Sequence, residues 1–237
     1  MNILVIGGMH GNEPLGLELV SLFNELPQVN IDCIIANPIA VEDGSRFVGV
    51  DLNRSFPGNG SGCSYEERRA YELIEICKKF DLVIDFHNTY CPENDCSFVG
   101  ENAKSELLSV SEYFGLNRAI VADYNCLNKY APNCISVEVS LDSILNNANY
   151  WYQKICRLRS KTVLTANPKL EKYKFVYRMN LEDRDRLKLD SLNLKAFQPI
   201  DDTVAGAMGV KSPAYPIFIA DKYTPYNYGG LLNKIDV

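Results

Sequence analysis

The sequence predicts an α/β fold in which a mixed, mainly parallel sheet is flanked by helices. The first observation is that short apolar segments alternate with longer amphipathic segments over the first two thirds of the chain, a pattern typical of a parallel sheet with helices on both faces. The second is a change near residue 165, after which short β-like stretches are separated by glycine and proline. We therefore expect a larger domain over residues 1–164 and a small β-rich capping domain over residues 165–237.

The alternation begins at the first residues of the chain. Residues 2–6 form an apolar run typical of a buried strand. Pro14 opens a helix that ends near residue 26, because proline costs little in the first helical turn. Residues 65–80 carry apolar side chains on one stripe and charges elsewhere, which predicts an amphipathic helix. By the same criteria the other expected strands are 32–36, 82–86, 120–122 and 134–139, the other helices are 104–114 and 143–158, and the late β-like stretches are 174–177, 210 and 215–220.

The charge pattern excludes some partners. The net charge is −6, and no block of lysine and arginine occurs, which argues against nucleic acid or an anionic membrane as the main partner. No apolar run approaches the roughly 18 residues of a membrane span. The amino terminus starts a strand at once and lacks the basic segment of a signal peptide. We therefore expect a cytoplasmic protein, and a homo-oligomer is compatible with the sequence.

The eight cysteines are scattered, and no two of them form a C-x-x-C pair. Reduced thiols are the expectation for a chain without a secretory signal. Cys91 and Cys96 flank a turn after His87 and could oxidise to each other or contact a metal. Zinc–cysteine sites usually show tighter paired spacing, however, which favours ordinary thiols.

The two histidines of the chain both follow apolar runs that are expected to be strands. His10 and His87 would then lie at carboxyl ends of strands, the edge of an α/β sheet where ligands bind. Glu13 follows His10 by three residues, so one loop could present both to the same ion. Two imidazoles and a carboxylate with an open fourth position are typical of catalytic zinc. The alternatives are ordinary buried or exposed histidines, and a phosphate loop, although the glycine spacing of such loops is missing.

A second set of polar residues follows the second expected strand. Asn53 and Arg54 lie in a loop that ends in Pro57-Gly58, and Arg46 lies eight residues before Arg54. A planar guanidinium beside an amide suits a carboxylate, because its donors match two oxygens at once. The alternative is a surface loop with ordinary salt bridges, which contribute little.

Glu138 lies inside a run of strand-forming residues, 135–139. An acidic side chain is costly to bury unless it has a partner or a task, and a general base belongs near strand ends that could hold a metal. The alternative is an edge strand whose polar side chains, Ser136 and Glu138, face solvent.

Four segments are informative when taken together: Gly8-Met9-His10-Gly11-Asn12-Glu13, Asp51-Leu52-Asn53-Arg54, Asp85-Phe86-His87-Asn88-Thr89 and Val137-Glu138-Val139. In order and spacing they resemble the aspartoacylase and succinylglutamate desuccinylase family, a branch of the zinc carboxypeptidase-like hydrolases. The resemblance covers most of residues 1–140 and extends more loosely to residues 215–218. It implies a zinc-carboxypeptidase-like mixed sheet, with residues 1–164 as the zinc-dependent catalytic domain.

The resemblance also implies the roles of the chemical groups. His10, Glu13 and His87 would hold one Zn²⁺ ion. Glu138 would be the general base, which takes a proton from metal-activated water and later hands it to the leaving amine. The metal and Arg46 would stabilise the oxyanion that forms on the amide carbonyl.

The substrate residues implied by the resemblance begin in the second segment. Asn53 and Arg54 would bind the α-carboxylate of the amino-acid half, and Tyr124 would line the substrate site. Tyr223 is the candidate for the carboxylate-binding tyrosine that the second domain supplies in this family, with Tyr226 as the alternative.

Two positions depart from the family. Aspartoacylases hold the aspartate side-chain carboxylate with an arginine about ten residues before the general base and a lysine just after the distal tyrosine. The corresponding positions are Asn128 and either Tyr226 or Asn227, and Lys129 could supply a point charge instead. N-acetylaspartate, N-succinylglutamate and neutral or aromatic N-acyl amino acids all stay open as substrates.

The sequence therefore predicts a zinc-dependent amidohydrolase that cleaves the amide bond of a small-molecule N-acyl amino acid. A zinc carboxypeptidase or peptide amidase is the first alternative, which an open cleft would favour. A zinc-binding protein without catalysis is the second, and the presence of Glu138 and Arg46 argues against it.

Overall fold

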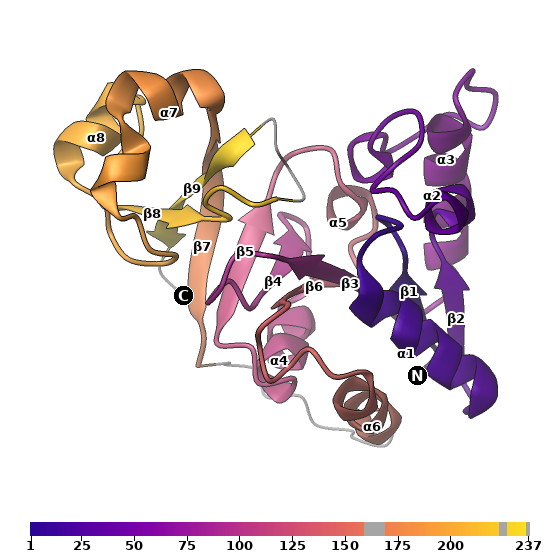
Figure 1. Ribbon diagram of the computed structural model, residues 1–237. Helices are drawn as coiled ribbons and strands as arrows, with labels where there is room; N and C mark the ends of the chain where they lie inside the picture. Colours follow the sequence, from indigo (N-terminus) through magenta and orange to yellow (C-terminus); the bar gives the residue numbers. More distant parts are fainter. Residues whose placement is uncertain (159–168, 223–226, 236–237) are drawn as a thin grey trace.

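The structure is a computed structural model that describes residues 1–158, 169–222 and 227–235 (Figure 1). Within these residues nine strands form one sheet, in the order β2-β1-β3-β6-β4-β5-β7-β9-β8. The strands are β1 (Ile3–Gly7), β2 (Ile31–Ile35), β3 (Leu82–Thr89), β4 (Cys96–Gly100), β5 (Arg118–Ala122), β6 (Cys134–Ser140), β7 (Glu171–Asn180), β8 (Ala214–Ile217) and β9 (Asn227–Ile235). Every strand expected before residue 165 is present.

The sheet is mixed. β1 pairs in parallel with β2 and β3, β3 with β6, β4 with β5, and β5 with β7. β4 runs antiparallel to β6, and β9 runs antiparallel to both β7 and β8. The neighbouring strands β2, β1, β3 and β6 therefore end at one edge of the sheet, which is where α/β sheets bind their ligands.

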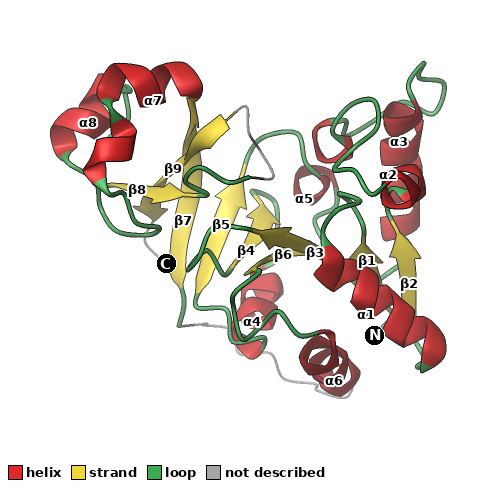
Figure 2. Ribbon diagram, viewed as in Figure 1, coloured by secondary structure: helices red, strands yellow, loops and turns green. Residues whose placement is uncertain are grey.

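Helices cover both faces of the sheet, as the alternation predicts (Figure 2). The helices before residue 165 are α1 (Pro14–Glu25), α2 (Pro38–Asp43), the 3-10 helix η1 (Leu52–Arg54), α3 (Tyr65–Cys77), α4 (Ser105–Tyr113), α5 (Leu127–Tyr130) and α6 (Ala148–Leu158). Apolar side chains of α1, α4 and α6 form one core with β1, β3 and β6. Side chains of η1, α3 and α5 form a second core on the opposite face. In the described part of the chain, no helix is both long and apolar enough to cross a membrane.

Two differences between the structure and the helices and strands expected before residue 165 have simple causes. The helix expected from residue 143 starts at Ala148, because the hydroxyl of Ser143 accepts a hydrogen bond from the backbone N–H of Leu145 and holds a turn there. The sequence does not predict strand β4, because its five residues include serine and glycine and give no clear alternation.

The last part of the chain continues the same sheet through β7, β9 and β8 and adds short helices at its end (Figure 1). These helices are α7 (Leu181–Leu187), the 3-10 helix η2 (Leu189–Leu192) and α8 (Asp202–Ala207). They pack on β7 and β9 through a core that includes Met179, Leu189, Ala205 and Leu231. The expectation of β structure at residue 210 is wrong. The sequence does not predict these helices, because they are too short to show a helical period of apolar residues. The division into a domain over residues 1–164 and a small β-rich capping domain over residues 165–237 stays a prediction.

A close backbone contact fixes α1 against the end of β1. A Cβ atom added to Gly7 would lie 2.2 Å from the carbonyl oxygen of Gly16, which belongs to α1. Only glycine allows this approach, and the contact sets the position of the loop between β1 and α1, which carries His10 and Glu13.

We expect Gly7→Ala to lower the free energy of unfolding by about 3 kcal/mol, because the added methyl group must push two buried backbones apart. Gly206→Ala is the matched control. A Cβ atom at this exposed position in α8 meets no atom within 4 Å, so alanine should stabilise the helix by about 0.5–1 kcal/mol. Urea denaturation followed by circular dichroism measures both, and equal stability of the two variants would contradict the proposed contact.

Candidate active site

The structure brings together the two histidines and Glu13. His10 follows β1, Glu13 is the N-cap residue of α1, and His87 lies in β3, which pairs in parallel with β1. The relative exposures of His10, Glu13 and His87 are 3%, 2% and 2%. One ligand atom from each residue lies within 4.8 Å of the others, so these three side chains could hold one metal ion.

Both imidazoles present the same nitrogen to Glu13. His10 Nδ1 lies 2.7 Å from Glu13 Oε1, and His87 Nδ1 lies 3.0 Å from Glu13 Oε2. Two nitrogen donors and a carboxylate that converge on one point form the donor set that Zn²⁺ prefers in catalytic sites.

A second carboxylate lies behind each imidazole. His10 Nε2 lies 3.2 Å from Asp51 Oδ1, and His87 Nε2 lies 2.8 Å from Asp85 Oδ2. Such carboxylates hold a proton on the outer nitrogen and leave the lone pair of the inner nitrogen for a metal. Neither role is among those predicted from the sequence, although Asp85 and His87 are two residues apart in one strand and must therefore face the same side of the sheet.

The charges of this cluster keep Glu13 ionised. Burial alone would raise the pKa of Glu13, but His10 and His87 hold it well below its ordinary value. Arg46 also contacts this carboxylate, since its Nη1 donates a hydrogen bond of 3.0 Å to Glu13 Oε1. Glu13 is therefore available as an anionic ligand.

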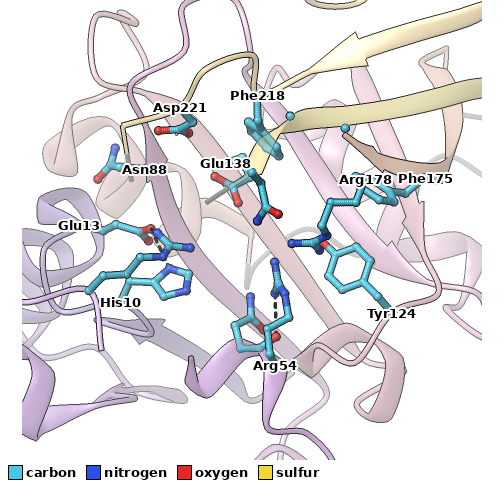
Figure 3. Close-up of a pocket in the computed structure, with 15 residues that line it drawn as sticks. His10, Glu13, Arg54, Asn88, Tyr124, Glu138, Phe175, Arg178, Phe218 and Asp221 are labelled. Carbon is cyan, nitrogen blue, oxygen red and sulfur yellow. Dashed lines mark hydrogen bonds and ion pairs between the residues drawn. The ribbon is translucent and has the colours of Figure 1, made fainter. Parts of the chain in front are cut away.

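A pocket opens beside this cluster (Figure 3). It contains about 650 Å³ of empty space, a volume that includes open solvent. Its lining residues are His10, Glu13, Arg46, Asn53, Arg54, Asn88, Tyr124, Glu138, Phe175, Arg178, Phe218, Asp221, Asn227, Gly229 and Gly230. Figure 3 shows Glu138 between two groups, with His10 and Glu13 on one side and Arg54, Tyr124 and Arg178 on the other.

Glu138 lies on an interior strand of the sheet. β6 pairs with β3 and β4, and Glu138 lies opposite His87 in the register with β3, so the interpretation as an exposed edge strand is wrong. Burial raises the pKa of Glu138 to about 8; His87 acts against this shift, and the nearby carboxylates of Glu13 and Asp221 add to it. A carboxyl group with such a pKa can take up and release a proton near neutral pH.

The opposite side of the pocket carries two arginines against one aromatic ring. The guanidinium carbons of Arg54 and Arg178 lie 4.8 Å and 5.5 Å from the centre of the Tyr124 ring. Neither forms a salt bridge with a carboxylate of the described residues. Burial lowers the pKa of Arg178, and the neighbouring charge of Arg54 lowers it further. Two half-buried cations that form no salt bridge within the described part of the chain suit an anionic ligand.

Sequence reasoning missed Arg178. It lies on β7 three residues after Phe175, and strict alternation would put the two side chains on opposite faces of the sheet. The register of β7 with β9 shifts between Phe175 and Tyr177, as in a β-bulge, and both Phe175 and Arg178 line the pocket. The bulge is set by the pairing with β9, so the sequence of β7 alone does not reveal it.

The other substrate residues expected from the resemblance have different positions. The side-chain oxygen of Asn53 accepts a hydrogen bond of 3.3 Å from the backbone N–H of Leu127, which leaves its amide group for a ligand. Tyr223 and its alternative Tyr226 lie outside the described residues. Lys129 does not line the pocket, because its ammonium group donates to the backbone carbonyl of Asp123.

Asn128 is a structural residue in this fold. Its side chain is 3% exposed, and its amide group donates to the carbonyl oxygens of Phe98 and Cys134 at 3.1 Å and 3.2 Å. Its oxygen accepts from the hydroxyl of Ser136 at 2.9 Å. Because all of these partners lie inside the protein, Asn128 does not take over the carboxylate contact of the family arginine.

Comparison with known proteins identifies related sequences. Residues 1–144 match the model of the succinylglutamate desuccinylase/aspartoacylase catalytic domain family. A probable aspartoacylase of Trichodesmium erythraeum is 30% identical over 146 residues, which are 55% of this chain and 50% of the relative. An N-acyl-aromatic-L-amino acid amidohydrolase (carboxylate-forming) of Xenopus laevis is 37% identical over 103 residues, which are 37% of this chain and 34% of the relative. The matches thus span half or less of each relative.

Two crystal structures share the fold. Succinylglutamate desuccinylase from Chromobacterium violaceum has a TM-score of 0.72 at 17% identity, over 99% of this chain and 85% of that chain. Murine aminoacylase 3 has a TM-score of 0.71 at 20% identity, over 100% of this chain and 96% of that chain. The predicted mixed sheet flanked by helices is therefore confirmed.

We expect Asn128→Ala to lower the free energy of unfolding by about 2 kcal/mol, because buried carbonyl groups and a hydroxyl lose their partner. For a chain of this size the melting temperature should fall by roughly 4–8 °C in differential scanning fluorimetry. Lys129→Ala, which changes the exposed neighbour, should leave the melting temperature unchanged. An unaltered melting temperature of Asn128→Ala would refute the structural role.

Proposed function

Because this chain belongs to the succinylglutamate desuccinylase/aspartoacylase family, we propose that it hydrolyses the amide bond of an N-acyl amino acid and releases a carboxylate and a free amino acid. The observation that carries the proposal is the position of Glu138 between the group that could hold a metal and the pair of arginines (Figure 3). A substrate bound to the arginines by its carboxylate would reach past Glu138 toward the His10 and Glu13 side.

We further propose that His10, Glu13 and His87 bind one Zn²⁺ ion. The support is the set of converging donors and the carboxylate behind each imidazole. A bound Zn²⁺ ion would polarise the amide carbonyl and make water a stronger acid. The same donors also bind other divalent metals, so the choice of zinc rests on the donor types and on the family.

The chain's own groups would move the proton and hold the substrate. Glu138 would accept a proton from the attacking water and deliver it to the nitrogen of the leaving amine, for which a pKa near neutrality is well suited. Arg46, which is held by Glu13, would stabilise the negative charge that develops on the amide oxygen.

The amino-acid half would bind at Asn53, Arg54 and Arg178. One guanidinium is enough to bind one carboxylate. The second half-buried arginine, Arg178, forms no salt bridge within the described residues and therefore favours an acidic amino acid, which brings a second carboxylate. A neutral aromatic amino acid is the second candidate, because Tyr124, Phe175 and Phe218 also line the pocket.

The pocket walls argue against both a peptide substrate and a zinc protein without catalysis. Phe218, Asp221 and Asn227, all from the last part of the chain, close one side of the pocket, and this closure favours a compact substrate over the peptide of a carboxypeptidase. Glu138 and Arg46 face the pocket beside the proposed metal ligands, where a protein without catalysis would have no use for a base and a cation.

The proposed function is tested by amine release from N-acetyl-L-aspartate, N-succinyl-L-glutamate and N-acetyl-L-phenylalanine with zinc-loaded protein. Glu138→Gln should lower kcat by about 10²–10⁴-fold, because it keeps the shape and removes the base, while the zinc content stays that of the original protein. Glu18→Gln, on the exposed side of α1, is the control and should be fully active.

The metal assignment is tested in the same assay. His10→Ala and His87→Ala should each lose bound zinc, measured by inductively coupled plasma mass spectrometry, and a chelator should abolish turnover until Zn²⁺ is restored. Full activity of Glu138→Gln would exclude the base, and zinc retention in both histidine variants would exclude the ligand set.

We expect Arg178→Met to raise the KM for N-acetyl-L-aspartate by about 10–100-fold, which corresponds to the loss of a charge-assisted hydrogen bond. The KM for N-acetyl-L-phenylalanine should change less, because that substrate lacks the second carboxylate. Lys174→Met, on the same strand in an exposed pair with Glu101, is the control. Equal effects of Arg178→Met on both substrates would show that Arg178 does not select the side chain.

A further inference from the structure

Ser136 is a buried polar residue that the proposed catalysis and the proposed substrate binding do not use. It is 4% exposed and lies in β6, two residues before Glu138. Side chains two residues apart in a strand share one face of the sheet, so Ser136 faces the same side as Glu138. Because Ser136 does not line the pocket, it cannot contact a substrate there, and its hydroxyl acts within the protein.

The pairing of β6 with β3 places Ser136 beside the proposed metal site. In this parallel register Ser136 lies opposite Asp85, and Glu138 lies opposite His87. One face of the two strands therefore carries two neighbouring pairs of polar side chains. The pair of His87 and Glu138 belongs to the candidate active site, and the pair of Asp85 and Ser136 lies next to it.

The carboxylate of Asp85 is held through one of its two oxygens. The residue is 0% exposed, its Oδ2 lies 2.8 Å from His87 Nε2, and the same Oδ2 accepts a hydrogen bond of 3.1 Å from the hydroxyl of Ser136. The other oxygen, Oδ1, has no hydrogen-bond partner within the described part of the chain. The Ser136 hydroxyl thus helps to fix the rotation of the carboxylate that turns Oδ2 toward His87.

The hydroxyl of Ser136 also has a second acceptor. Its Oγ lies 2.9 Å from Asn128 Oδ1, and this oxygen faces Ser136 because the amide group of Asn128 donates to two carbonyl oxygens. The single hydroxyl proton is therefore shared between a neutral and a charged acceptor. Hydrogen bonds to ionised groups are roughly twice as strong as neutral ones, so Asp85 is the favoured partner.

We propose that Ser136 is a positioning residue for the proposed metal site, and that it acts through Asp85 on His87. The inference rests on the proposed function, in particular on zinc binding by His10, Glu13 and His87. Ser136 holds Asp85 Oδ2 against the Nε2 atom of His87. His87 then keeps its Nδ1 atom toward Glu13, which is the orientation that it needs to share a metal ion with Glu13.

The affinity for zinc tests the proposal without any substrate. The dissociation constant for Zn²⁺ is measured in competition with a chromogenic chelator. Ser136→Ala removes a single oxygen atom and should raise this constant about tenfold, the lower end of the effect for residues that orient metal ligands. Ser97→Ala is the matched control, because Ser97 is also buried, lies in the neighbouring strand β4, and has its Oγ 2.8 Å from Ser111 Oγ. This variant should bind zinc like the original protein.

A double variant tests whether Ser136 acts through Asp85. Asp85→Asn should raise the dissociation constant by about 10–100-fold. Adding Ser136→Ala to Asp85→Asn should raise it little further, because the carboxylate that the hydroxyl orients is then already absent.

The visible absorption spectrum of the Co²⁺-saturated protein gives a second readout. This spectrum reports the geometry of the ligands at full occupancy, which a loss of stability alone would leave unchanged. The bands of Ser136→Ala should differ from those of the original protein, and the bands of Ser97→Ala should not.

The outcomes separate this inference from the proposed function. Equal zinc affinity of Ser136→Ala and the original protein would overturn the positioning role, and so would equal losses in Ser136→Ala and Ser97→Ala. Fully additive effects of Ser136→Ala and Asp85→Asn would show that Ser136 does not act through Asp85. In these cases the proposed function would stand. If the original protein binds no zinc, the metal assignment fails and this inference fails with it.

Discussion

The parallel pairing of β1 with β3 is the constraint on which the candidate site depends. Ile6 lies opposite Asp85 in this pairing, so the chain leaves β1 beside the point where β3 presents His87. The contact of Gly7 with α1 then sets the entry of the helix, and Glu13 at its N-cap falls between the two imidazoles. A shift of β3 by one residue would turn His87 to the other face of the sheet, and the three donors would no longer meet.

The resulting cluster is a row of alternating acids and bases: Asp51, His10, Glu13, His87 and Asp85. Buried carboxylates are costly unless they are paired. Within the described residues, the three carboxylates of the row form one salt bridge with an arginine, that of Glu13 with Arg46. Protons on the histidines or a divalent cation can balance this excess, and both would occupy the inner nitrogens. Protons and metal therefore compete for the same atoms, which is the usual behaviour of a metal site with histidine ligands.

The parts of the site that the sequence predicts are those that depend on local patterns. His10 and His87 follow readable apolar runs, and these runs are the strands β1 and β3. Arg178 depends on a bulge against a strand some fifty residues further along the chain, so no local pattern could place it. Asn128 has the right position in the sequence for a substrate ligand, but its side chain turns inward to bond β4 and β6. The direction in which a side chain points, unlike its position in the sequence, is decided by tertiary packing.

The site residues that the sequence predicts and those that it does not predict come from different parts of the chain. The segment that matches the family model, residues 1–144, supplies the proposed metal ligands, the proposed base Glu138 and Arg54. Arg178 and Asp221, which also line the pocket, come from beyond that segment. The sequence matches to a probable aspartoacylase and to an N-acyl-aromatic-L-amino acid amidohydrolase each cover half or less of those proteins, so such matches identify the family and not the substrate. Because β7 belongs to the same sheet as the strands before it, Arg178 is placed by the same network of strand pairing as the proposed catalytic residues.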